Sequence, residues 1–107
     1  MGIEEGDGDL KDQLAAIESA LASSKVDPYI AHEFAQRKDD PDFNAGEFLV
    51  AMLARVSDPT FRIEGVRILS GIGNILAMQA PFTSFPDLVA EKKVIYLEAS
   101  RPAGLAE

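Results

Sequence analysis

The chain has 107 residues, no cysteine and a formal net charge of −8, and 47% of its residues are hydrophobic. This length predicts one domain with a modest core, and the lack of cysteine excludes disulfides, thiolate metal sites and cysteine nucleophiles. The acidic balance argues against direct nucleic acid binding, which needs clustered lysine and arginine. We therefore expect a soluble, acidic protein of the cytoplasm.

The N-terminus is acidic, unlike a signal peptide, and the longest apolar run, residues 68–82, is too short and too polar to span a membrane. The excess negative charge lies in the first part of the chain. Residues 1–47 contain 12 acidic and 4 basic side chains, whereas residues 48–107 contain 6 of each. An acidic half is suited to a basic protein partner, because opposite charges accelerate association.

Residues 1–8 are rich in glycine and acidic side chains, so we expect a flexible acidic tail. Asp9 can cap a first helix that runs from Leu10 to about Ser23. Its apolar side chains recur at helical spacing and form one stripe: Leu10, Leu14, Ile17 and Leu21.

Three Asp-Pro steps come next, at Asp27-Pro28, Asp40-Pro41 and Asp58-Pro59. Aspartate is a favoured N-cap and proline a favoured first helical residue, so each step predicts the start of a helix. A second helix is therefore expected from Pro28 to a point before Pro41, with Ile30 and Phe34 facing the core.

A third helix is expected from Pro41 or Asn44 up to Asp58. Asn44 and Glu47 have the spacing of a capping box. The apolar residues after them form a broad helical face: Phe48, Leu49, Met52, Leu53 and Val56.

The segment 60–79 has two interpretations. As a helix it is apolar nearly all round beyond Arg67, which is typical of a buried central helix. As a hairpin it has strands at 61–69 and 75–79 joined by a turn at 70–74. We favour the helix, because Asp58-Pro59 marks a helix start, although its three glycines each disfavour one.

A last helix is expected over residues 85–99, although residues 94–97 have a strand-like composition, and residues 101–107 should form a flexible tail. The sequence thus predicts an all-α fold, a compact helical bundle of four to five short helices within a single domain at 9–100. The alternative is an α+β fold with a hairpin at about 60–79.

No residue pattern predicts catalysis or a cofactor. His32-Glu33 lacks the second histidine of a zinc protease motif, and the two glycines of residues 70–74 lack the lysine of a phosphate loop. Residues 39–48 contain oxygen ligands between two expected helices, but neither alignment to a calcium-binding loop places its glycine and final carboxylate correctly. We therefore expect no enzyme, no catalytic or metal residues and no cofactor.

The charge asymmetry favours a small protein-binding module, such as an inhibitor, an immunity-type protein or an adaptor, that meets a basic partner through its N-terminal half. The expected contact residues cluster on one connection: Asp39, Asp40, Asp42 and Glu47. Two alternatives remain at this point. One is a structural subunit of a larger assembly or homo-oligomer, and the other is a divalent-metal-binding domain that uses the acidic turn 39–47.

Overall fold

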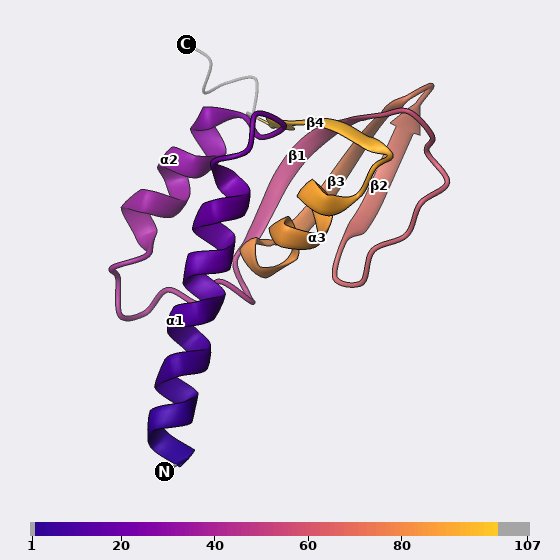
Figure 1. Cartoon of the computed structure of the whole chain (residues 1–107). Coiled ribbons are helices and arrows are strands. Elements are labelled where there is room, and N and C mark those ends of the chain that lie inside the picture. Colours follow the sequence, from indigo (N-terminus) through magenta and orange to yellow (C-terminus); the bar gives the residue numbers. More distant parts are fainter. Residues whose placement is uncertain (1, 101–107) are drawn as a thin grey trace.

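A computed structural model describes the backbone of residues 2–100 and the side chains from Lys11 onward. Met1 and residues 101–107, including the expected C-terminal tail, lie outside the described part. The described residues fold into three α-helices and a four-stranded antiparallel sheet (Figure 1). The predicted all-α helical bundle is therefore wrong, and the alternative α+β fold is correct.

The elements follow one another as α1, α2, β1, β2, β3, α3 and β4, and a short 3₁₀ turn, Phe82–Ser84, precedes α3. The helices are α1 Gly2–Leu21, α2 Pro28–Arg37 and α3 Phe85–Ala90. The strands are β1 Leu49–Val56, β2 Arg67–Ile72, β3 Ile75–Pro81 and β4 Val94–Ala99. In the sheet the strands lie in the order β2-β3-β1-β4, and all neighbours are antiparallel.

The first two helices agree with the sequence prediction in type. α1 buries Ile17 and Leu21 and begins at Gly2, ahead of the expected Leu10. α2 begins at Pro28, and the Asp27 carboxylate accepts a hydrogen bond from the backbone N–H of Tyr29 at 3.0 Å. Ile30 and Phe34 are buried, as their spacing predicts.

The expected third helix is instead strand β1. Its side chains alternate between exposed and buried along the whole element, which is the period of a strand. The buried set comprises Val50, Met52, Ala54 and Val56. The helical interpretation also assigns Leu49 and Leu53 to the core, but these two side chains are 54% and 38% exposed.

The expected central helix is instead the hairpin of β2 and β3, with Ile72 paired to Ile75 across the turn Gly73-Asn74. A turn this tight requires a positive φ, and Gly73 adopts φ 60°. Leu76, Met78 and Ala80 of β3 alternate into the core beside β1. A strand needs only this alternation, so the glycines that disfavour a helix are tolerated at the turn and the edge.

The expected last helix ends early, at Ala90, and Glu91 already has extended backbone. Residues 94–99 form β4, in which Val94 and Leu97 are buried. The strand-like composition of residues 94–97 was the correct indication, because β-branched and aromatic residues fit a pleated surface better than a helix.

The sheet has one helix-covered face. α1 lies against α3 on this face, with α2 beside α1 (Figure 1). Strands β1 and β2 are both antiparallel to β3, which lies between them, so residues 57–66 form a crossover connection, and this connection contains no helix. Buried Phe61 anchors the connection in the core.

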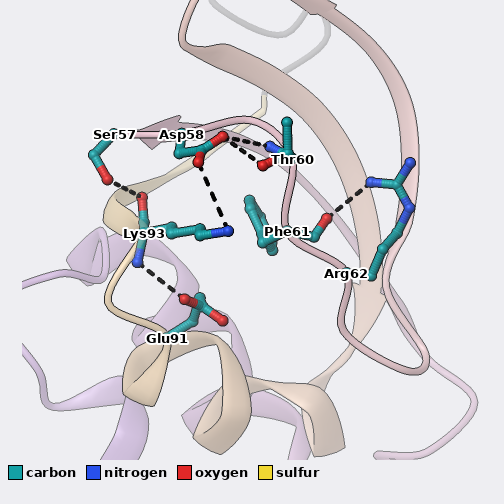
Figure 2. Close-up of polar contacts among 7 residues, drawn as sticks. All are labelled: Ser57, Asp58, Thr60, Phe61, Arg62, Glu91 and Lys93. Carbon is teal, nitrogen blue, oxygen red and sulfur yellow. Dashed lines mark hydrogen bonds and ion pairs between the residues drawn. The ribbon is translucent and has the colours of Figure 1, made fainter.

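Polar contacts fix the start of this crossover (Figure 2). The Asp58 carboxylate accepts hydrogen bonds from the N–H and the hydroxyl of Thr60, at 2.9 and 2.6 Å. Lys93 lies 3.7 Å from the same carboxylate, and the N–H of Ser57 donates to the carbonyl of Lys93 at 2.8 Å. The crossover is thereby joined to the loop between α3 and β4.

Aromatic side chains fill the core between α2, the 3₁₀ turn and the start of β1. Phe82 is fully buried at their centre. Its ring centroid lies 5.0–5.9 Å from those of four neighbours: Phe34, Phe43, Phe48 and Phe85. Phe43 and Phe48 are only partly buried, so this cluster reaches the surface beside the acidic turn.

Candidate functional site

The acidic connection between α2 and β1 is held by local hydrogen bonds. The Asp40 carboxylate accepts from the N–H of Asp42 at 2.9 Å, and the Asn44 side chain accepts from the N–H of Gly46 at 2.9 Å. Such side-chain-to-backbone bonds stabilise turns. The spacing of Asn44 and Glu47 therefore belongs to a turn that leads into β1, and the expected capped helix is absent from it.

Three of the four predicted contact residues surround one open pocket of about 300 Å³: Asp40, Asp42 and Glu47. The pocket is also lined by Arg37, Phe43, Asn44 and Phe48. The fourth residue, Asp39, lies beside a neighbouring hollow that is formed with α1. We name the first hollow the acidic pocket.

The acidic pocket is lined by both acidic and aromatic side chains. The guanidinium carbon of Arg37 lies 4.4 Å from the ring centroid of Phe48, and Arg37 also forms an ion pair with Glu33 at 3.5 Å. Three carboxylate residues thus line a pocket whose one guanidinium already has partners. This arrangement is suited to the side chain of a lysine or arginine, whose apolar stem can contact the rings while its charge remains near the carboxylates.

Lys38 lies at the edge of the second hollow, where it forms a hydrogen-bonded ion pair with Glu18 of α1. The hydrogen bond to Glu18, followed by the Coulomb attraction of the same carboxylate, raises the pKa of Lys38 above its ordinary value of 10.5. The pair is exposed, so it links α1 to the end of α2 with little effect on stability.

Within the part of the chain whose side chains are described, no three histidine or acidic residues are grouped so that they could bind a metal ion. His32 is exposed on α2. In the same part of the chain, no helix is long and apolar enough to cross a membrane.

A second surface was missed by the sequence reasoning. The sheet face opposite the helices carries alternate residues of all four strands, and we name it the open face. β1 contributes Leu49, Ala51, Leu53 and Arg55, and β3 contributes Ile75, Ala77 and Gln79. The outer strands contribute Tyr96 and Glu98 of β4 and Arg67, Ser70 and Ile72 of β2. The alternation along residues 49–56 indicates this surface once the segment is interpreted as a strand.

Leu53 lies at the middle of the open face, between Ala77 of β3 and Glu98 of β4. It lines two hollows. One, of about 60 Å³, is formed with Arg55, Ile75, Tyr96 and Glu98. The other, of about 460 Å³, is formed with Asp27, Glu98, Ala99 and Ser100. The face is therefore apolar at its centre, with charged and aromatic side chains around that centre.

No family model, no curated protein and no solved structure matches this chain. Function is therefore inferred from the geometry of the acidic pocket and the open face.

Proposed function

We propose that this chain is a small, non-enzymatic protein-binding module that binds its partner through the open face. The observation that carries this proposal is the composition of that face on β1. Three of its four side chains there are apolar, namely Leu49, Ala51 and Leu53, and all three are exposed. Antiparallel sheets normally present polar residues on a solvated face, and contiguous exposed apolar patches mark interaction sites.

The acidic pocket supports a basic partner. Glu47 of the pocket and Leu49 of the open face are separated by Phe48 alone, so the two surfaces adjoin at the start of β1. One partner could contact both surfaces if it covered the open face with an apolar patch and placed a lysine or arginine in the acidic pocket. Burial of the apolar patch would supply affinity, and the charges would supply orientation and a faster association rate.

The inhibitor, immunity-type and adaptor roles all fit such a module, and the cysteine-free chain suits a reducing compartment such as the cytoplasm. The test is capture from source-cell extract by the wild-type chain and by Leu53→Lys. The matched control is Ala16→Lys, which adds the same charge at an exposed position on α1. We expect Leu53→Lys to lose a partner that Ala16→Lys retains.

The contribution of the acidic pocket is tested with that same partner. Asp42→Asn combined with Glu47→Gln should slow association and flatten its dependence on salt, because exposed charges act mainly on the association rate. A partner that binds all of these variants equally would contradict the proposed function.

A further inference from the structure

The two edges of the sheet differ in whether their backbone is already bonded. At β4 the chain segment 25–27 runs alongside as a short parallel bridge from Val26 to Leu97. The N–H of Asp27 donates to the carbonyl of Leu97 at 2.8 Å, and the N–H of Leu97 donates to the carbonyl of Lys25 at 2.7 Å. The Asp27 carboxylate also accepts from the N–H of Ala99 at 3.0 Å. The β4 edge is thus closed.

The β2 edge is open. Among residues 2–100, β2 forms backbone hydrogen bonds with β3 only. Its exposed apolar side chains include Leu69, at 53%, and Ile72, at 87% the most exposed large hydrophobic side chain described. Natural edge strands are commonly protected by charged side chains, proline or β-bulges. β2 contains no lysine or proline, and its charged Arg67 and its register shift between Ile68 and Ser70 both lie in its first half, so residues 70–72 contain no such feature.

We propose that β2 pairs with β2 of a second copy of this chain, antiparallel and around a two-fold axis at Gly71. Ile72 and Ile75 flank the two-residue turn, and such a pair exchanges backbone hydrogen bonds. The N–H and carbonyl of Gly71 therefore point away from β3, toward a neighbouring strand. A glycine at this position also permits close approach of another backbone.

The remaining features of β2 agree with this register. A register shift between Ile68 and Ser70 bends the strand at Leu69, but residues 70–72 keep regular pairing with β3 and supply the new contact. Ile72 of one copy lies opposite Ser70 of the other, and the two Arg67 side chains are at opposite ends of the contact. The acidic connection after α2 lies on the far side of the sheet from β2 (Figure 1), so its charge does not oppose the pairing.

The closed β4 edge limits the assembly to two copies, because each chain offers one open edge and the contact is isologous. A six-residue edge buries less surface than a standard interface, so the dimer should form at high concentration and dissociate on dilution. The pairing would extend the sheet and place both open faces on the same side of the dimer.

Sedimentation velocity over micromolar to millimolar concentration tests the dimer. We expect Ile72→Lys to weaken association about tenfold, while Leu49→Lys, at an exposed position of β1 on the open face, leaves it unchanged. Ile72 is exposed, so its substitution should not disturb the fold. Gly71 itself is unsuitable, because a Cβ there would lie 2.7 Å from the side chain of Leu76.

Cysteine cross-linking tests the register, since the natural chain has no cysteine. In the proposed register, position 70 of one copy lies opposite position 72 of the other. The double variant Ser70→Cys and Ile72→Cys should therefore form a covalent dimer on oxidation. Neither single variant should do so, because its cysteine lies opposite a residue that is not a cysteine. A chain that stays monomeric at millimolar concentration would overturn the proposal. Association that Leu49→Lys abolishes and Ile72→Lys does not would also overturn it, and would assign the contact to the open face. Loss of partner capture by Leu53→Lys is independent of both outcomes.

Discussion

The two faces of β1 differ in how far their apolar side chains are covered. Toward the helices it presents Val50, Met52, Ala54 and Val56, all nearly inaccessible to solvent, whereas Leu49 and Leu53 on the opposite face are exposed. Apolar side chains stabilise a fold only where they leave water on folding. The covered face therefore contributes to stability, and the open face, whose apolar side chains stay in water, contributes little to it.

The largest expected effect concerns the covered side. Phe82→Ala removes the ring at the centre of the aromatic cluster and should lower the free energy of unfolding by about 3–5 kcal/mol. Leu49→Ala, an exposed apolar truncation, should lower it by less than about 1 kcal/mol. Urea denaturation of both variants measures the difference, and similar losses would mean that the open face is buried in the folded chain.

Two adjacent residues give the sharper comparison. Met52→Ala should cost about 2–5 kcal/mol of stability because Met52 is buried on the helix-covered face, beside Met78 of β3. Leu53→Ala should cost less than about 1 kcal/mol, although it alters the next residue of the same strand. Thermal unfolding followed by circular dichroism compares them, and a reversed order would show that the strand register is wrong.

A smaller effect is expected at the closed edge of the sheet. The Asp27 carboxylate both caps α2 and accepts the N–H of Ala99, so Asp27→Ala should cost about 1–2 kcal/mol. Asp40→Ala is the control. The Asp40 carboxylate accepts a hydrogen bond from the N–H of Asp42, as Asp27 does from Tyr29, but it accepts none from the backbone of a strand. Equal losses of stability in the two variants would mean that the Ala99 contact contributes nothing.

The smallest effect depends on pH and tests the polar contacts at the start of the crossover, residues 57–66. Hydrogen bonds from the Thr60 hydroxyl and N–H, together with the nearby charge of Lys93, lower the pKa of Asp58 below its ordinary value of 3.8. The ionised carboxylate thus stabilises the fold fully above that ordinary value, and the contribution is lost as the pH falls through the lower pKa of the folded state.

Asp58→Asn should therefore be less stable than the natural chain near neutral pH, and the difference should shrink in acid. Urea unfolding at a series of pH values measures it. A difference that stays constant across the acidic range would show that the charge of Asp58 is not the cause. Pro59 and Thr60 are unchanged in this variant, so the local turn is otherwise preserved.

The sequence located part of the candidate site. Asp40, Asp42 and Glu47 were predicted from local charge density, and the structure places them around one pocket because a short connection keeps them close. The open face could not be predicted in the same way. Its residues come from four strands that meet only after the sheet has formed, and its central residue, Leu53, was expected inside a helix bundle.

The three Asp-Pro steps show what the sequence alone determined. In each, the aspartate accepts a hydrogen bond from the N–H of the residue after the proline: Asp27 from Tyr29, Asp40 from Asp42 and Asp58 from Thr60, at 2.9–3.0 Å. These bonds span two residues and need no distant partner, so local chemistry is sufficient to form them.

Only the tertiary structure decided whether a helix or a strand forms after each turn. After Asp27 a helix forms because Ile30 and Phe34 meet the aromatic core on one face. The other two steps lead into extended chain, and residues 49–56 and 67–81 become strands because β1, β3 and their neighbours supply each other's backbone hydrogen bonds. Those partners are far apart in sequence, and a periodicity measured within one segment contains no information about them.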